Sequence, residues 1–509
     1  MKNRSPQVWK HLILGLALAL TSAALLTLAF PPYNLWPLIW VGFIPMLVAQ
    51  YRLMPQKLSS LAPAVAIGGW LGGYLVPIFG GSGSYMAWLP LVIGFIILLT
   101  DKNKRAFHER SGYRWFVLEG TLGWVGLEML RSFIPIMGTW AFTAYALYAQ
   151  PWLIQPVSIF SIFGLGLLIL LVNYALALEA LSLLNKTLWQ NARRWLLIAG
   201  IVWVGWISLS LVLYRTPALP IVRVAAIQVP GRAANNRSYE KDPQRRAERF
   251  QQLQEQTRQA AGQGAKIIVW PEGALDSDPQ VEHTAELRSL AQETQAYLVI
   301  GYMVTLPDGI WRNESTVISP GGEFMGVFGK DHPVVFGGER NTSLGIYPVY
   351  VTTAGRLGTI ICYDLDFTDT ARKVARGGAQ VIAVSSLDWP TIASKHYSHV
   401  VFRAVENRIA MVKSDSGYDS AIIDPYGRII EKVITSEGVN ATLVADVPLG
   451  AGNTFVTRLG DWVGWLCLAG LVFFAIFMPV TMQRGKEAMT RPLCHFVTPP
   501  PNPSDLGEE

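Results

Sequence analysis

The stretch GTIICYDLDF, residues 358–367, places a cysteine directly after an apolar run and follows it with a tyrosine and acidic residues. A short apolar run rich in β-branched residues is typical of a buried strand, so this pattern predicts a strand that ends at Cys362. In α/β domains, functional groups commonly lie where strands end. Cys362 is therefore a candidate functional residue.

The segments on both sides of this stretch predict an α/β domain with buried sheets. Apolar strand-like runs alternate with charged helix-like runs over residues 215–457. The strand-like runs are VRVAAIQV (222–229), KIIVWPE (266–272), AYLVIGYM (296–303) and QVIAVSS (380–386). The helix-like runs lie at 243–264, 284–295, 368–379 and 394–408. Regular alternation of this kind favours sheets covered by helices.

Two further strand ends carry groups that complement a thiol. IIVWPEGAL (267–275) brings Glu272 to a strand end, and FMGVFGKDH (324–332) does the same for Lys330. A carboxylate, an ammonium and a thiol supply the base, the oxyanion stabiliser and the nucleophile that covalent acyl transfer needs. Each residue also has a structural interpretation: a buried packing cysteine, a surface lysine and a helix-capping glutamate.

The composition of the chain predicts a membrane domain before the α/β domain. Of 509 residues, 51% are hydrophobic and only 15% are charged, which is unusual for a soluble protein. A helix needs about 20 apolar residues to cross a bilayer. The sequence predicts seven spans before residue 215 and one after the α/β domain, at residues 12–30, 35–50, 61–79, 85–100, 115–134, 155–184, 195–214 and 459–480.

The first apolar segment has an alternative interpretation as a secretory signal, because lysine and arginine precede it and small residues lie within it. Its apolar run continues past those small residues to Phe30, which favours an uncleaved helix.

The distribution of lysine and arginine predicts the orientation. With the N-terminus inside, every cytoplasmic connection carries basic residues, whereas the opposite connections PPYN, GGSGS and GTWAFTAYALYAQPW carry none. This bias places both termini in the cytoplasm and residues 215–457 outside it. The net charge of +6 is largely explained by these loops, so it does not indicate a nucleic-acid partner.

Three cysteines cannot form a disulfide framework in the outer domain, where Cys362 stands alone. A lone thiol in an oxidising compartment calls for a specific explanation. The sequence shows no phosphate-binding glycine loop and no metal-ligand cluster, so no metal or cofactor is predicted. Because no carboxylate or thiolate lies at site-like spacing, we interpret His332, His396 and His399 as hydrogen-bonding residues.

The order Glu272, Lys330, Cys362, with WPEG and CYD around the first and last, resembles the Glu-Lys-Cys triad of the nitrilase superfamily. Its position behind several spans and before a final one resembles the apolipoprotein N-acyltransferase family of the bacterial envelope, over nearly the whole chain. Smaller similarities support this resemblance: FGKDHPVVFGGER (328–340), HVVFRAVENR (399–408), SAIIDPYGRI (420–429), RNES (312–315) and GLEMLRSF (126–133).

The sequence also departs from the family pattern. The family's glutamate after Phe-Gly is Gly338 here, with Glu339 displaced by one place, and the usual Cys-Tyr-Glu ends in Asp364. SSLDWP (385–390) and IQVPGRAANN (227–236) replace two further family segments.

The resemblance implies a multi-span α-helical membrane domain at 1–214 and an extracytoplasmic α/β nitrilase-like domain, an αββα sandwich, at 215–457. A C-terminal transmembrane helix at 458–482 and a disordered cytoplasmic tail at 483–509 would follow. It implies a bacterial inner-membrane protein that acts as a monomer.

The implied reaction has two steps. Cys362 would take an acyl chain from a phospholipid as a thioester, and a diacylglyceryl lipoprotein would accept it on its N-terminal amine. Glu272 would act as the base, and Lys330 would stabilise the oxyanion together with the backbone N–H of Tyr363. The resemblance places six residues in oxyanion or substrate binding: Tyr363, Glu339, Asp364, Asn313, Trp389 and Arg131.

Several alternatives remain open. Arg131 holds a lipid phosphate, or it pairs with Glu119 and Glu128 at one helix end. The protein could be a membrane-tethered amidase, an acyltransferase with a different amine acceptor, or a non-catalytic scaffold. The helix expected after Cys362, together with Lys330, predicts that this cysteine favours the thiolate.

Overall fold

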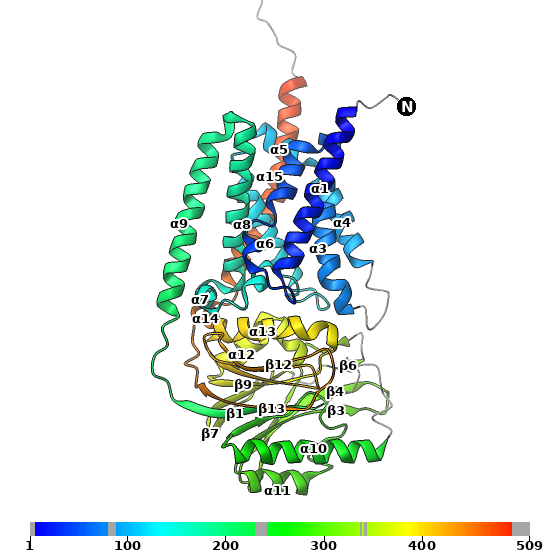
Figure 1. Cartoon of the computed structure of the whole chain (residues 1–509), viewed down its shortest axis with the longest axis vertical. Helices are drawn as coiled ribbons and strands as arrows, with labels where there is room; N and C mark the ends of the chain where they lie inside the picture. The colour runs from blue at the N-terminus through cyan, green and yellow to red at the C-terminus, as the bar shows by residue number, and fades with distance from the viewer. Residues whose placement is uncertain (1–5, 80–87, 230–241, 336–337, 341–343, 491–509) are drawn as a thin grey trace, which may run out of the picture.

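The computed structural model describes residues 6–79, 88–229, 242–335, 338–340 and 344–490. Figure 1 shows a helical bundle joined end-on to an α/β unit, with α13 lying between the two parts. The beginning of α1 (Pro6–Ala29) and the end of α15 (Trp462–Thr490) both lie at the end of the bundle far from the α/β unit. The two described chain ends are therefore on the same side of the bundle.

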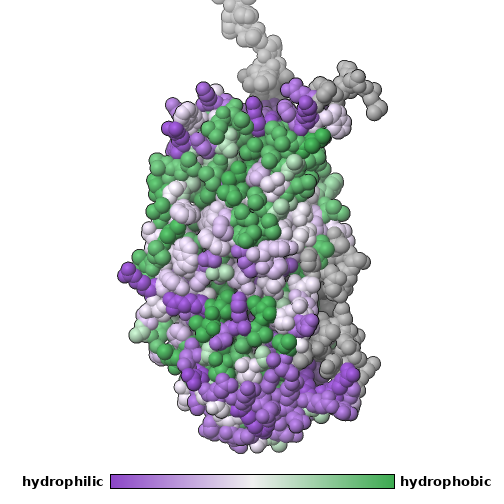
Figure 2. All heavy atoms as spheres, in the orientation of Figure 1, coloured by the Kyte–Doolittle hydropathy of each residue, from purple (hydrophilic) through white to green (hydrophobic). Residues whose placement is uncertain are grey.

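Long apolar helices build the bundle. Five of the described helices are long and apolar enough to cross a membrane: Gln7–Ala29, Gln56–Val76, Val157–Leu184, Lys186–Leu213 and Trp462–Thr481. Figure 2 shows hydrophobic side chains over these helices, with hydrophilic ones gathered beyond them at both ends of the molecule. An apolar band of this kind is what contact with lipid requires, so the bundle is a multi-pass membrane domain.

The helices of the bundle differ in length, and some of them depart from the predicted spans. The larger elements are α3 (Leu61–Phe79), α4 (Leu89–Thr100), α5 (Lys104–Arg110), α6 (Phe116–Arg131), α8 (Val157–Leu184) and α9 (Trp189–Leu213). Short turns η6 (Thr143–Leu147) and α7 (Pro151–Ile154) join α6 to α8. The predicted span at 85–100 begins within residues 80–87, which lie outside the described residues.

The predicted span at 35–50 is wrong as a single helix. It is divided into η1 (Trp36–Trp40), α2 (Ile44–Val48) and the start of η2 (Ala49–Leu53). Broken backbone within a bilayer is tolerated only where other groups satisfy its hydrogen bonds. Asn173 of α8 does this, because its amide donates to Ile39 O (2.9 Å) and accepts from Phe43 N (3.0 Å).

The α/β unit contains two sheets packed face to face. The first has the strand order β13-β1-β2-β3-β4-β5, with β6 beside β4, and the second has the order β12-β11-β10-β9-β8-β7. The first sheet consists of β1 (Ile221–Gln228), β2 (Ile267–Val269), β3 (Tyr297–Thr305), β4 (Trp311–Ile318), β5 (Phe324–Gly329), β6 (Glu339–Arg340) and β13 (Ala441–Pro448). The second consists of β7 (Val349–Thr352), β8 (Gly355–Ile361), β9 (Val381–Ser386), β10 (Ala410–Asp415), β11 (Asp419–Ile423) and β12 (Ile429–Ile434).

Helices cover the outer face of each sheet, which gives the predicted αββα sandwich. Helices α10 (Pro243–Gly262) and α11 (Thr284–Thr294) cover the first sheet, and α12 (Thr368–Arg376) and α13 (Pro390–Asn407) cover the second. The strands β1, β2 and β3 run parallel, as do β8, β9 and β10. The carboxyl ends of parallel neighbours meet at one edge of a sheet, so side chains that follow those strands come together there.

Helix α13 joins the two parts of the molecule, since its core cluster is shared with the bundle. Its charged side chains reach backbone groups of the membrane helices. Lys395 Nζ donates to Tyr74 O of α3 (2.9 Å), and Glu406 accepts from Ile162 N of α8 (2.9 Å). The short α14 (Phe455–Leu459) then leads into α15, which continues to Thr490, past the predicted boundary at 482. The tail at 491–509 lies outside the described residues.

Candidate active site

Three strand ends converge between the sheets. Glu272 follows β2, Lys330 follows β5 and Cys362 follows β8. Lys330 Nζ lies 2.8 Å from Glu272 Oε1 and 3.1 Å from Glu339 Oε1. All three groups of the predicted triad are buried, with Cys362 9% exposed.

Cys362 sits in a sharp turn. Its φ of +40° lies in the left-handed region, which non-glycine residues rarely adopt and which is found preferentially at functional sites. Asp364 holds this turn, because one carboxylate oxygen accepts from Ile361 N (2.9 Å) and the other from His332 N (2.8 Å). The aspartate that replaces the family's glutamate therefore ties the cysteine turn to the lysine loop.

Glu339 and Asn313 complete the polar environment of Lys330. Asn313 of β4 donates to Glu272 Oε1 and, at 2.9 Å, to Glu339 Oε1. The other oxygen of Glu339 accepts from Val334 N at 2.5 Å. The displacement of Glu339 by one place in sequence thus does not keep its carboxylate away from the lysine.

Burial and charge set the proton affinities of these groups. Burial raises the pKa of Glu272, and the charge of Glu339 adds to this effect, although Lys330 opposes it. For Lys330, burial acts to lower the pKa, but Glu272, Glu339 and Cys362 outweigh it and raise the pKa well above its usual value. Burial also raises the pKa of Asp364, to about 7. Lys330 is therefore a fixed cation beside a carboxylate that holds a proton more readily than usual.

The expectation that Cys362 favours the thiolate is wrong for this structure. Burial raises the pKa of the thiol well above its usual value, and the negative charges of Glu272 and Asp388 raise it further. Lys330 opposes these effects without overcoming them. The resting nucleophile is therefore a thiol, and a base must remove its proton during the reaction.

Asp388 was missed as a neighbour of the nucleophile. Its Oδ1 lies 3.6 Å from Cys362 Sγ, within hydrogen-bonding range for sulfur. His396 Nδ1 lies 2.7 Å from Asp388 Oδ2, and Lys413 Nζ donates to the same oxygen at 2.8 Å. Asp388 and Cys362 are 26 residues apart and follow different strands, so local sequence patterns carry no sign of this contact.

The side chains of the remaining predicted substrate residues contact membrane segments. The hydroxyl of Tyr363 donates to Pro135 O, and Trp389 Nε1 donates to Ile78 O (2.7 Å), so both connect the α/β unit to membrane segments. Arg131 packs over the Phe142 ring, with 5.0 Å to its centroid. Its Nε has no hydrogen-bond partner among the described residues.

Of the two carboxylates considered as partners of Arg131, Glu119 pairs with other groups, whereas the charge of Glu128 interacts with that of Arg131. Glu119 forms ion pairs with Lys104 and His108, each at 3.2 Å. Glu128 accepts hydrogen bonds from Thr143 N (2.9 Å) and Trp124 Nε1 (3.2 Å).

Each of the three predicted histidines has a carboxylate partner, which the sequence spacing did not reveal. His332 lies 3.0 Å from Asp369, His396 lies between Asp388 and Asp366, and His399 Nδ1 lies 2.7 Å from Asp366. Clusters of this composition can hold a metal ion, and two of them share His396.

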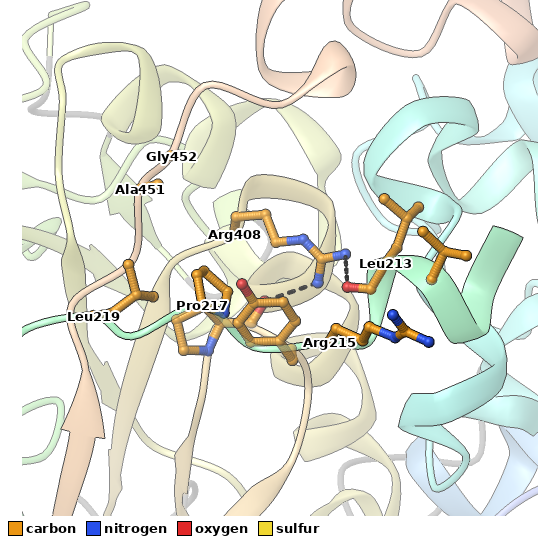
Figure 3. A pocket seen from close by; sticks show the side chains of 10 residues that line it. Leu213, Arg215, Pro217, Leu219, Arg408, Ala451 and Gly452 are labelled. Carbon is orange, nitrogen blue, oxygen red and sulfur yellow. Dashed lines mark hydrogen bonds between the residues drawn. The ribbon is translucent and has the colours of Figure 1, made fainter.

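A pocket of about 270 Å³ lies away from the triad, where the chain passes from the end of α9 toward β1 (Figure 3). Arg408 donates to Leu213 O (3.4 Å), as Figure 3 shows. It also donates to Gln155 Oε1 (2.5 Å). A cation at the carboxyl end of a helix stabilises the free carbonyl groups there. We therefore interpret Arg408 as a cap of α9.

Comparison with known proteins agrees with this architecture. Residues 223–454 match the carbon-nitrogen hydrolase family, and residues 22–175 match the apolipoprotein N-acyltransferase N-terminal domain. An apolipoprotein N-acyltransferase of Geobacter metallireducens is 28% identical over 511 residues, covering 90% of this chain and 94% of the relative. One of Gloeobacter violaceus is 27% identical over 522 residues, covering 92% and 96%.

A solved amidase from Nesterenkonia sp. is 20% identical and aligns with a TM-score of 0.36, covering 45% of this chain and 91% of that one.

A membrane-spanning bundle joined to a carbon-nitrogen hydrolase unit defines a multi-pass bacterial membrane enzyme of the nitrilase superfamily. Within that superfamily, the match of the N-terminal domain and the full-length relatives name the same family: the chain belongs to the apolipoprotein N-acyltransferase family.

Proposed function

We propose that this enzyme transfers a fatty acyl chain from a phospholipid to the N-terminal amine of a diacylglyceryl-cysteine lipoprotein, through a thioester on Cys362. The observation that carries this proposal is the convergence of Glu272, Lys330 and Cys362 at three strand ends beside a membrane domain. A buried base, cation and thiol are what an acyl-enzyme mechanism requires.

In the first step, Glu272 accepts the proton of the Cys362 thiol while the sulfur attacks an ester carbonyl of the phospholipid. Lys330 stabilises the negative oxygen of the tetrahedral intermediate, a role in which the loss of one donor commonly costs about 100- to 1,000-fold in rate. The intermediate collapses to a thioester, and Glu272 returns the proton to the departing lysophospholipid. The raised pKa of Glu272 suits a group that both accepts and returns a proton near neutral pH.

In the second step, the free amine of the lipoprotein attacks the thioester carbonyl. Glu272 accepts a proton from the attacking nitrogen and delivers it to the sulfur as the thiol of Cys362 leaves. Asn313 would hold Glu272 and Glu339 in place around Lys330 through both steps, since it donates to the same two carboxylate oxygens that Lys330 Nζ contacts.

We further propose that residues 1–214, 215–457 and 458–482 form separate domains and that the protein works as a monomer.

We also propose that the α/β unit lies outside the cytoplasm. The absence of basic residues in the loops on that side of the bundle supports this orientation. A cysteine introduced at the exposed Glu282 should react with a membrane-impermeant maleimide in cells whose inner membrane is intact. Labelling that requires permeabilisation would reverse the orientation.

The experiment that tests the function follows a labelled acyl chain. Purified protein is incubated with phospholipid labelled in its acyl groups and with a diacylglyceryl lipopeptide that has a free N-terminus. The label should appear as an amide on the lipopeptide. Release as free fatty acid at the same rate with and without lipopeptide would identify a membrane-tethered hydrolase, and transfer only to other amines would identify a different acceptor.

A further inference from the structure

Cys362 is flanked by a second carboxylate that the proposed reaction does not use. Asp388 follows Leu387, the first residue after β9, and its side chain is fully buried. Its Oδ1 is 3.6 Å from Cys362 Sγ. Glu272 Oε1, in contrast, already accepts hydrogen bonds from Lys330 and Asn313.

Asp388 is fixed on several sides. His396 of α13 bonds both of its oxygens, at 2.8 and 2.7 Å. Lys413 of β10 donates to Oδ2 (2.8 Å), and Asp388 N donates to Asp415 Oδ2 (2.9 Å). A carboxylate held in this way cannot turn away from the sulfur without breaking buried hydrogen bonds, which is costly.

The bonds to Asp388 also keep it ionised. Burial acts to raise its pKa, but the charges of His396 and Lys413 hold that pKa well below its usual range. Asp388 and Asp366 likewise outweigh the effect of burial on His396 and raise its pKa to about 9. A carboxylate that holds its charge so firmly is a hydrogen-bond acceptor for the thiol rather than a base that takes its proton.

We propose that Asp388 is a positioning residue that keeps Cys362 in its protonated form between turnovers and points its S–H into the protein. This inference concerns the resting state of the nucleophile assigned under the proposed function. Because the thiolate is the species that alkylating agents and oxidants attack, a thiol held in this way is protected outside the cytoplasm.

The charged groups that surround the sulfur define what must be held constant in a test. Glu272 and Lys330 follow β2 and β5, and Asp364 and Asp366 lie in η10 (Cys362–Asp366). His396 and Lys413 contact the carboxylate of Asp388. The test must therefore remove the charge of Asp388 and leave these groups in place. Asp388→Asn does so while keeping the size of the side chain.

Asp419 offers a matched control. It is another fully buried carboxylate of the same network and contacts Lys413, as Asp388 does. Burial and the charge of Asp388 raise the pKa of Asp419 well above its usual value. Asp388 contacts Cys362 Sγ, whereas Asp419 contacts Lys413, so Asp419→Asn alters the same network without removing the carboxylate at the sulfur.

The experiment measures the rate at which iodoacetamide alkylates Cys362 in the full-length protein between pH 6 and 10, with peptide mass spectrometry to distinguish it from the other cysteines. The wild-type rate should rise with a midpoint above the ordinary cysteine pKa of about 8.5. In Asp388→Asn the midpoint should fall by at least ~1 unit, which makes alkylation at pH 8 about tenfold faster. Asp419→Asn should keep the wild-type midpoint.

Three results would overturn the inference: a wild-type midpoint below that ordinary value, a midpoint that is unchanged or higher in folded Asp388→Asn, or an equal fall in Asp419→Asn. If Asp388→Asn does not fold, as judged by gel filtration and circular dichroism, Asp388→Ser takes its place as a second neutral variant. The alkylation profile does not depend on acyl transfer. Loss of the proposed function would therefore leave this test valid, and failure of this test would leave the proposed function standing.

Discussion

Glu339 gives the clearest quantitative test of the site, because it shares one cation with the proposed base. Lys330 Nζ lies 2.8 Å from Glu272 Oε1 and 3.1 Å from Glu339 Oε1, so the two carboxylate oxygens are no more than about 6 Å apart. At an effective dielectric constant of about 20, unit charges at that distance repel by ~3 kcal/mol. This energy corresponds to ~2 units in the pKa of Glu272.

Glu339→Gln removes the repulsion and keeps the size of the side chain. The pKa of Glu272 should fall, since a neighbouring negative charge no longer disfavours its ionised form. The acidic limb of the kcat/KM profile reports the base in the free enzyme, so it should move down by about 1–2 pH units. The plateau value of kcat/KM should fall by about tenfold, because a weaker base accepts the thiol proton less effectively.

The assay is acyl transfer from phospholipid to lipopeptide between pH 4 and 9, with Glu314→Gln as the control. Glu314 is a buried carboxylate in the same strand as Asn313, but it lies near Arg312, at 3.7 Å, rather than Lys330. Its substitution should leave the acidic limb in place. A folded Glu339→Gln protein whose acidic limb stays fixed or moves to higher pH would refute the assignment of Glu272 as the base.

Three further predictions concern the triad, the broken helix and the turn at the nucleophile. Acyl transfer should disappear while the protein remains folded and membrane-inserted in each of three variants: Glu272→Gln, Lys330→Ala and Cys362→Ala. Asn173→Leu leaves two buried backbone groups of the broken segment unpaired, so the free energy of unfolding in detergent should fall by about 2–4 kcal/mol. Asn191→Leu removes one part-buried hydrogen bond and serves as the control, because it should lower the free energy of unfolding by less than half of that amount. Asp364 has a folded pKa of about 7, above the usual value of about 3.9, so its ionisation opposes folding and stability should fall as pH rises from about 4 to 7. Asp364→Asn should flatten the dependence of the unfolding temperature on pH over that range, and an unchanged slope would show that another group causes it.

The strand ends were predictable from sequence because they follow from local patterns. Apolar runs that end in Glu272, Lys330 and Cys362 indicate where each side chain emerges, and parallel strands bring such ends to one edge. Glu339 was expected to be displaced, yet the backbone after β5 brings its carboxylate to Lys330. Glu339 lies in β6, which pairs with β4, so its position depends on strand pairing as well as on its place in the sequence.

Other features depend on long-range contacts or on energetics that spacing does not report. The apolar content of residues 35–50 predicted a helix, but Pro37, Pro45 and the hydrogen bonds of Asn173 determine where it breaks. The predicted thiolate failed because burial and two carboxylates outweigh one lysine, and burial cannot be read from neighbours in sequence. The contact between Asp388 and the sulfur joins strands that are neighbours only in the folded sheet.

The central claim is that Cys362 carries the acyl chain between donor and acceptor, and intact-mass spectrometry tests it most directly. Purified protein incubated with phospholipid alone should become heavier by one acyl group, and the adduct should map to Cys362. Neutral hydroxylamine should remove the adduct, as expected of a thioester, and a lipopeptide with a free amine should discharge it into an amide. If lipopeptide is acylated under conditions where no adduct forms on wild-type protein, or where Cys362→Ala remains active, the acyl-enzyme mechanism is wrong.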